Sequence, residues 1–358
     1  MSTPETAPAP LRLGTRGSAL ATTQSGLVAR RLEELLGRPV ELVRIRTEGD
    51  VKTGSLASLG GTGVFVTALR EALLDGRCDV AVHSLKDLPT AQPADLTIVT
   101  PEREDPRDAL CGRDGLTLDT LPRGARVGTG SPRRAAQVQA ARPDVELVDI
   151  RGNVETRLAR ALGPDADLDA VVLALAGLSR LGRTEVVTQA LDPAVVAPAP
   201  GQGALAVEAR TADLAPGSPL AEAFAALDHR PTRLAVLAER AVLARLEAGC
   251  AAPVGAHSRV EAGELQLTAV VARVDGTEQL THSASAVLAP HDAVAQDDAA
   301  TALGVRVAEA LLADGAARLA PLVGGTGEPR TGEDDDVAPR SDVEPLHTPT
   351  GTDDPEGA

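Results

Sequence analysis

The chain of 358 residues has no tryptophan and no tyrosine, and two phenylalanines are its only aromatic residues. Its cores must therefore be packed from aliphatic side chains. Sites that bind single-stranded nucleic acids or sugars usually stack aromatic rings on the ligand, so this composition argues against both kinds of site. The formal net charge of -16 argues in addition against a general nucleic-acid or anionic-membrane partner, because both are negatively charged.

Cysteine is also scarce. Cys78, Cys111 and Cys250 are far apart and form no C-x-x-C motif or Cys/His cluster of the kind that binds a metal. The first ten residues lack the charged and apolar regions of a secretion signal, and no apolar run reaches the ~18 residues of a membrane-spanning helix. We therefore expect a reduced, cytoplasmic protein without a metal site.

The negative charge is unevenly distributed. Residues 326–358 contain ten acidic and two basic side chains, so this segment carries half of the net charge. It is rich in proline and glycine and has almost no apolar periodicity. Such a segment buries too little surface to offset the entropy lost on ordering, so we predict a disordered acidic tail. Residues 1–10 are predicted to be a disordered leader.

Between these ends the chain alternates strand and helix patterns. Strands are predicted at 11–13, 40–45, 79–84, 126–128, 145–150, 170–175 and 204–209. Helices are predicted to end near residue 36, to span 64–74 and 154–162, and to start at Ser131-Pro132. This alternation indicates parallel βαβ units. Beyond 217, helices at 220–227, 234–247 and 301–312 enclose strands at 265–271 and 280–287, which indicates a small α+β domain.

Arginine pairs follow two of the predicted strands. Arg133 and Arg134 come after the strand at 126–128, and Arg151 and Arg157 come after the strand at 145–150. In α/β sheets, ligands bind beyond the carboxyl ends of the strands, where guanidinium groups hold carboxylates or phosphates bidentately. Solvated helix faces account for the same arginines equally well, so these residues alone leave both interpretations open.

Three further signals are weak when each is taken alone. Lys86 and Asp87 follow the apolar strand at 79–84, where a carboxylate accepts a proton or stabilises a cation, although a surface ion pair is the simpler interpretation. Cys250 lies in a loop next to Gly249, accessible to modification, but a lone cysteine is more often buried. The glycine-rich run at 60–63 precedes a helix and suits an anion site or a flexible turn.

Together these segments resemble one family. The matching motifs are LGTRGS at 13–18, HSLKDLP at 83–89, EDPRD at 104–108, RGNV at 151–154, AGL at 176–178, GQGA at 201–204 and the Cys250 loop. In this order they are similar to the hydroxymethylbilane synthases, also called porphobilinogen deaminases, over about residues 10–322. Ser58 and Thr62 stand where that family commonly has lysine, and Pro132 stands where it often has leucine.

The resemblance implies a transferase of tetrapyrrole biosynthesis. It joins four porphobilinogen molecules head to tail with release of ammonia, and then hydrolyses off linear hydroxymethylbilane. The chain grows on a dipyrromethane cofactor, held by a thioether that the resemblance assigns to Cys250, and the catalytic carboxylate falls on Asp87. The residues implied to bind cofactor and substrate carboxylates are Arg16, Ser18, Lys86, Ser131, Arg133, Arg134, Arg151, Arg157, Arg180 and Gln202.

The fold implied by the resemblance is α/β with three domains. Domain 1 (11–103 plus 201–217) and domain 2 (104–200) are expected to be like the two lobes of type II periplasmic binding proteins. Domain 3 (218–325), a small α+β domain, carries Cys250, and the acidic tail follows. We expect a monomer whose partner is the small molecule porphobilinogen, with no nucleic acid and no membrane.

Two other classes of function remain as alternatives. A non-catalytic, two-lobed protein that captures a small acid would suit the sheets and the arginines equally well. The presence of Asp87 together with Cys250, and the lack of a secretion signal, favour the enzyme. A scaffold organised by its acidic tail explains none of the internal motifs.

Overall fold

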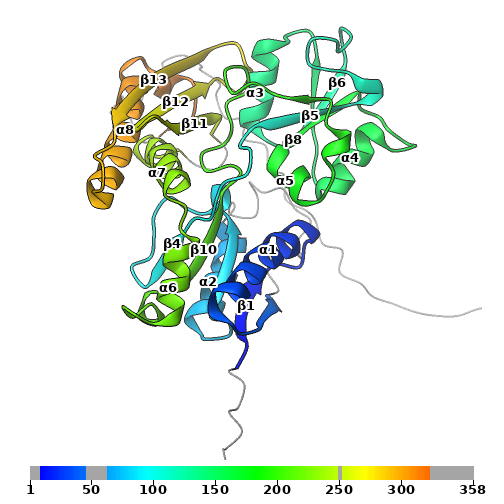
Figure 1. The fold of residues 1–358 in the computed structure, drawn as a ribbon. Coiled ribbons are helices and arrows are strands. Elements are labelled where there is room, and N and C mark those ends of the chain that lie inside the picture. Colours follow the sequence, from blue (N-terminus) through cyan, green and yellow to red (C-terminus); the bar gives the residue numbers. More distant parts are fainter. Residues whose placement is uncertain (1–8, 46–62, 249–251, 323–358) are drawn as a thin grey trace, which may run out of the picture. The chain divides into compact units, whose positions relative to one another are not determined.

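The computed structural model describes residues 9–45, 63–248 and 252–322 (Figure 1). The predicted acidic tail, most of the predicted leader, the glycine-rich run at 60–62, and Ser58, Thr62 and Cys250 lie outside the described residues. Within the described part, no helix is long and apolar enough to cross a membrane.

The first sheet has five strands in the order β2-β1-β3-β10-β4. The strands are β1 (Leu11–Thr15), β2 (Val40–Arg44), β3 (Val80–Ser84), β4 (Leu96–Val99) and β10 (Leu205–Arg210). Strand β1 is parallel to β2 and β3, whereas β10 runs antiparallel between β3 and β4. The helices of this part are α1 (Ala19–Leu36), α2 (Gly63–Leu74) and α6 (Pro219–Leu227). The sequence predicts all of these elements to within about two residues except β4.

The second sheet also has five strands, in the order β7-β6-β8-β5-β9. The strands are β5 (Asp108–Gly112), β6 (Arg126–Thr129), β7 (Glu146–Asp149), β8 (Ala170–Ala174) and β9 (Gln189–Ala190). Strand β6 is parallel to β7 and β8, whereas β5 is antiparallel to β8 and β9. Three helices accompany the sheet: α3 (Pro132–Ala141), α4 (Val154–Leu162) and α5 (Leu175–Arg180).

The predicted parallel βαβ units are confirmed for β1-α1-β2 and β6-α3-β7, but each sheet also contains antiparallel strands, so both sheets are mixed. Strand β5 follows β4 of the first sheet and β10 follows β9 of the second, so neither is reached through a helix that packs back on its own sheet. Leu205 of β10 pairs with Ser84 at the end of β3, and Asp108 of β5 pairs with Ala174 at the end of β8. The two segments that cross between the sheets therefore lie where the parallel strands end.

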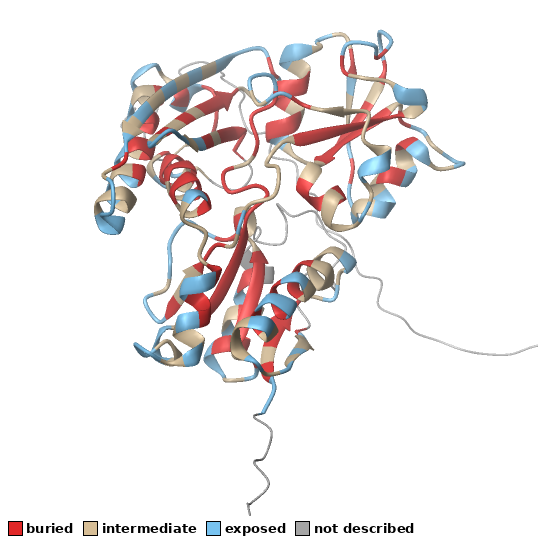
Figure 2. Ribbon diagram, viewed as in Figure 1, coloured by how far each residue is buried: buried red, intermediate tan, exposed pale blue. Residues whose placement is uncertain are grey.

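A three-stranded antiparallel sheet completes the described chain, which confirms the expected α/β class with a small α+β part. Its order is β11 (Val254–Glu261), β12 (Glu264–Ala272) and β13 (Gln279–Val287), and it packs with α7 (Arg230–Arg245) and α8 (Ala293–Ala313). The sequence missed β11, whose residues are mostly small or polar, and placed the start of α8 eight residues too late. Figure 2 shows buried residues in α7, α8, β11 and β12, whereas β13 is intermediate to exposed along its whole length.

Local signals explain where several helices begin and end. Ser18 Oγ accepts a hydrogen bond from Ala21 N at the start of α1, and Asn153 Oδ1 accepts one from Thr156 N at the start of α4. Gly37 ends α1 with a left-handed φ of 63°. Ser131 occupies the N-cap position of α3 as predicted, but its side chain makes no capping hydrogen bond.

Two helical glycines should respond oppositely to alanine. A Cβ on Gly304 in α8 would meet Ala238 O and come within 2.6 Å of Ala241 Cβ in α7, so we expect Gly304→Ala to destabilise the protein by about 1–3 kcal/mol. The nearest atom to a Cβ on Gly26 in α1 is Arg30 Nη1 at 3.9 Å, so Gly26→Ala should stabilise by about 0.5–1 kcal/mol. Thermal denaturation checks both. Equal changes of Tm in the same direction for the two variants would contradict the close approach of α7 and α8.

Candidate active site

The predicted binding residues gather beyond the carboxyl ends of parallel strands in the first two sheets. Arg16 and Ser18 follow β1, Lys86 and Asp87 follow β3, Ser131, Arg133 and Arg134 follow β6, Arg151 follows β7, and Arg180 ends the helix after β8. Arg157 lies in α4, one turn after its start. This placement is the one in which α/β sheets bind ligands.

Asp87 closes a short 3-10 turn (Leu85–Asp87) directly after β3. The turn is anchored on both sides: Leu85 N donates to Ala204 O at 3.0 Å, and Arg240 of α7 donates to the carbonyl oxygens of Leu85 and Leu88. The half-buried carboxylate of Asp87 itself makes no hydrogen bond or ion pair within the described residues. Within the described residues it is therefore an unpaired carboxylate on a fixed backbone.

Arg133 and Arg134 share one fully buried carboxylate, that of Asp108 at the start of β5. Arg134 donates to Asp108 Oδ1 from Nε at 2.9 Å and from Nη2 at 2.8 Å. Arg133 Nη1 lies 2.8 Å from Asp108 Oδ2 and also donates to Ala197 O. The side chains of both arginines are only about 5% exposed. The two guanidinium groups hold the pKa of Asp108 well below its usual range although burial opposes this.

Gln202 connects this ion cluster with Lys86. Its Nε2 donates to Asp108 Oδ1 and to Pro106 O, both at 2.7 Å. Its Oε1 accepts from Lys86 Nζ at 3.2 Å and from Arg134 Nη2 at 3.4 Å. The amide thus has cations on its oxygen side and acceptors on its nitrogen side, which fixes its orientation. Lys86, Arg134 and Gln202, predicted separately from the sequence, therefore form one connected group with Asp108.

Lys86 has a perturbed pKa. Its pKa is lowered to about 8, mainly by burial and also by the nearby Arg134 and Arg133, whereas Asp87 and Asp108 oppose this shift. Three cations face two carboxylates, so the group has excess positive charge that a bound carboxylate would neutralise. Burial likewise lowers the pKa of Arg157, which Arg134 and Arg151 also lower.

The other predicted residues have simpler surroundings. Arg180 donates from Nη2 to Gly203 O at 2.6 Å, next to Gln202. Arg157 donates to Gly152 O at 2.8 Å, and exposed Arg151 pairs with Asp149 at 3.1 Å. Arg16 is half-buried and follows β1, and Ser18 caps α1. Ser131 donates a hydrogen bond from its backbone N–H to Thr129 Oγ1.

The resemblance implies a dipyrromethane, which is a ligand with several carboxylates. The residues present fit such a ligand. Arg180 Nε is buried and has no hydrogen-bond partner among the described residues. A ligand carboxylate would accept a hydrogen bond from this N–H group. Lys86 uses one of its three donors within the described part of the chain. The attachment residue Cys250 lies outside the described residues. The free thiols of Cys78 and Cys111 are buried, and burial raises the pKa of Cys111 to about 12.

A second buried carboxylate, which the sequence did not reveal, joins the crossing segments to the third sheet. Glu239 of α7 accepts from both terminal nitrogens of Arg103, at 2.7 and 2.9 Å, and from Gly201 N at 2.7 Å. It also accepts from the backbone N–H and the hydroxyl of Ser258 in β11, both at 2.9 Å. Arg103 in turn donates to Gln202 O at 2.7 Å. Glu239 therefore supports the backbone on which Gln202 lies.

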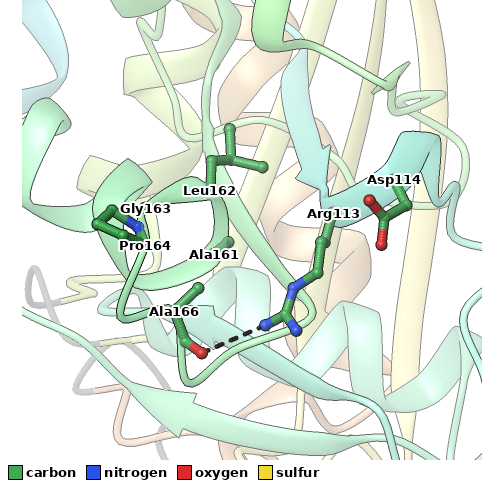
Figure 3. Close-up of a pocket in the computed structure, with 7 residues that line it drawn as sticks. All are labelled: Arg113, Asp114, Ala161, Leu162, Gly163, Pro164 and Ala166. Carbon is green, nitrogen blue, oxygen red and sulfur yellow. Dashed lines mark hydrogen bonds between the residues drawn. The ribbon is translucent and has the colours of Figure 1, made fainter.

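A pocket of about 300 Å³ lies elsewhere, beside the end of α4 (Figure 3). Arg113, Asp114 and the segment 161–166 line it, and Arg113 Nη2 donates across it to Ala166 O. None of the predicted site residues lines this pocket. We therefore place the candidate site at the strand ends around Asp87 and Lys86.

Comparisons with known proteins show which family the chain belongs to. The family described as "Porphobilinogen deaminase, dipyromethane cofactor binding domain" matches residues 11–216, and "Porphobilinogen deaminase, C-terminal domain" matches residues 233–313. The chain is 55% identical to the porphobilinogen deaminase of Micrococcus luteus over 93% of this chain and 99% of that protein. It is 56% identical to the Cutibacterium acnes porphobilinogen deaminase over 87% of this chain and 97% of that one.

A solved periplasmic substrate-binding protein from Coxiella burnetii is similar to 64% of this chain and 94% of its own, at 16% identity and a TM-score of 0.38. The two family matches together include the segments that carry Asp87, Asp108, Gln202 and Glu239. The relatives match almost over their full lengths. The chain therefore belongs to the porphobilinogen deaminase family and contains that family's dipyrromethane cofactor-binding domain.

Proposed function

We propose that Asp87 is the catalytic carboxylate of a working porphobilinogen deaminase. The observation that carries this proposal is a half-buried carboxylate on an anchored turn, with no partner in the described chain and with the cations Lys86, Arg134 and Arg133 nearby. Porphobilinogen carries two carboxylates and a pyrrole ring that loses ammonia. The cations suit the carboxylates, and Asp87 suits the reacting ring.

Asp87 performs two tasks in this proposal. Loss of ammonia leaves positive charge on the substrate pyrrole, and a carboxylate beside it stabilises that charge. When the new carbon–carbon bond has formed, a proton leaves the ring carbon, and the same carboxylate accepts it. Because the backbone around Leu85 is hydrogen-bonded on both sides, little reorganisation is needed between the two tasks.

The dipyrromethane would be held by Lys86, Arg133, Arg134, Arg157 and Arg180, with Arg16, Ser18, Ser131, Arg151 and Gln202 completing the set. When bound, it supplies the pyrrole ring to which the first substrate is joined. The proposed attachment is a thioether to Cys250, in line with the soft nucleophilicity of a thiolate. The arginines orient carboxylates bidentately and so fix the position of the rings next to Asp87.

The organisation proposed from the sequence goes with this function. Domain 1 comprises 11–103 plus 201–217, which is supported by the pairing of β10 with β3 and β4. Domain 2 comprises 104–200 and domain 3 comprises 218–325. We expect the working unit to be a cytoplasmic monomer that acts on a small-molecule substrate.

Intact-protein mass spectrometry tests the proposed function. The recombinant chain should carry a covalent adduct with the mass of two linked pyrrole units, and Cys250→Ser should lack it. Purified wild type should also release ammonia from porphobilinogen. A folded wild type with neither adduct nor ammonia release would instead indicate a binding protein for small acids.

A further inference from the structure

Asp108 is the most enclosed charged group of the site, and the proposed function gives it no task. Its carboxylate is completely buried, yet it contacts three side chains from two segments: Arg133 and Arg134 of α3, and Gln202 of the β9–β10 connection. The Gln202 amide in turn accepts a hydrogen bond from Lys86 after β3. A carboxylate without exposure cannot itself bind a large substrate. Its effect on the reaction must act through these neighbours.

The hydrogen bonds of Asp108 determine how its neighbours are oriented. Arg134 uses Nε and Nη2 on Asp108 and Nη1 on Val172 O, so its guanidinium plane is fixed by three bonds. Gln202 donates to the same Asp108 oxygen and thereby turns its own oxygen toward Lys86 and Arg134. Asp108 therefore orients one guanidinium and one amide, and the amide in turn locates the Lys86 ammonium.

We propose that Asp108 is a positioning residue for carboxylate capture: it fixes Arg133 and Arg134, positions Lys86 through Gln202, and balances the positive charge of these three groups. The proposal rests on the proposed function, because it assigns these cations to the cofactor and substrate carboxylates. It adds a residue that touches neither ligand and sets the pH range in which the site captures them.

The charges that face Lys86 determine the expected sign. They are Asp87 on its own turn, Asp108 on β5, and Arg133 and Arg134 on α3. Removing the negative charge of Asp108 takes away a group that raises the pKa of Lys86, so the lysine loses its proton at a lower pH. Removing the positive charge of Arg134 has the opposite effect. A residue that only stabilises the fold would shift the pH dependence in neither direction.

The experiment measures cofactor loading rather than turnover. Full-length chain made in cells that lack porphobilinogen is incubated with porphobilinogen across a range of pH, and intact-protein mass spectrometry gives the fraction that carries the adduct. Wild type should load well near neutral pH and lose loading as Lys86 deprotonates, at about pH 8. In Asp108→Asn the midpoint of this loss should fall by about one pH unit, since a neighbouring charge moves a pKa by that order. In Arg134→Gln the midpoint should rise.

Glu208→Gln is the matched control, because the Glu208 side chain is also fully buried and pairs with Arg70 at 2.8 Å, and Glu208 is not among the charges that face Lys86. Its midpoint should equal that of wild type. Unchanged midpoints in both Asp108→Asn and Arg134→Gln, or shifts of the same sign, would overturn the proposal. If Asp108→Asn does not fold, the test uses Arg134→Gln alone. A loading midpoint above that of wild type supports the proposal, and the absence of this rise overturns it. Failure of wild type to load at any pH would instead reject the proposed function.

Discussion

Asp87→Asn should lower the turnover of porphobilinogen by about 10²–10⁴-fold while the protein stays folded, since general-base and electrostatic contributions of one carboxylate are of this size. The fold should survive because the Asp87 side chain has no hydrogen-bond or ion-pair partner within the described residues. The rate of porphobilinogen consumption and a thermal melt measure the two effects. The assay belongs near pH 7, below the pKa of about 8 for Lys86, because loss of the Asp87 charge also makes Lys86 easier to deprotonate.

Asp95→Asn is the control for Asp87→Asn. Asp95 is an exposed carboxylate in the turn just before β4, and its removal should leave turnover at the wild-type level. KM should change much less than kcat in Asp87→Asn, because the cations that hold the substrate carboxylates remain. Retention of more than a tenth of wild-type turnover would remove Asp87 from its proposed role.

Glu239→Ala should be the most destabilising substitution considered, by about 3–5 kcal/mol, because it leaves a buried arginine without its partner. The variant loses the acceptor of five hydrogen bonds from Arg103, Gly201 and Ser258, in a place with no access to solvent. In a chain of this size we expect a fall in Tm of about 10 °C. Calorimetry is the suitable measurement, since several sheets need not unfold together.

Glu278→Ala provides the comparison for Glu239→Ala. Glu278 pairs with Arg273 at 2.6 Å, as short as the buried pair, but both side chains are more than two-fifths exposed. Exposed ion pairs contribute only about 0–1 kcal/mol, so Tm should hardly change. Similar falls in Tm for Glu239→Ala and Glu278→Ala would show that burial of Glu239 is not the cause of its destabilisation.

Sequence reasoning located the residues that stand at the ends of strands. Lys86 and Asp87 follow an apolar strand, and Arg133, Arg134 and Arg151 follow two others, so the strand pattern alone places them at the sheet edges. Periodicity alone left these arginines open as ligand-binding or solvated residues. The structure buries Arg133 and Arg134, whereas Arg151 is exposed and pairs with Asp149. The ends of α1 are set locally, because Ser18 and Gly37 cap the helix through bonds to residues three or four positions away.

The supporting carboxylates were missed for a physical reason. The run EDPRD contains Glu104, Asp105 and Asp108, and only the pairing of β5 with β8 decides that Asp108 is the buried one. Glu239 interrupts the apolar pattern of a helix and resembles an exposed residue, yet Arg103 lies 136 positions away in the chain. Burial of a charge depends on partners brought together by tertiary structure, which periodicity does not contain.

The mixed strand directions have a consequence for how the chain is built up. Because β5 and β10 both start at a carboxyl edge, the chain leaves the first sheet and returns to it at neighbouring points, where Glu104 N donates to Gly203 O at 3.3 Å. The second sheet is thus an insertion whose two ends meet. A module attached in this way can be lengthened, trimmed or replaced without changing the strand order of its host, so its surface loops are free to vary while the residues at the junction are held in place.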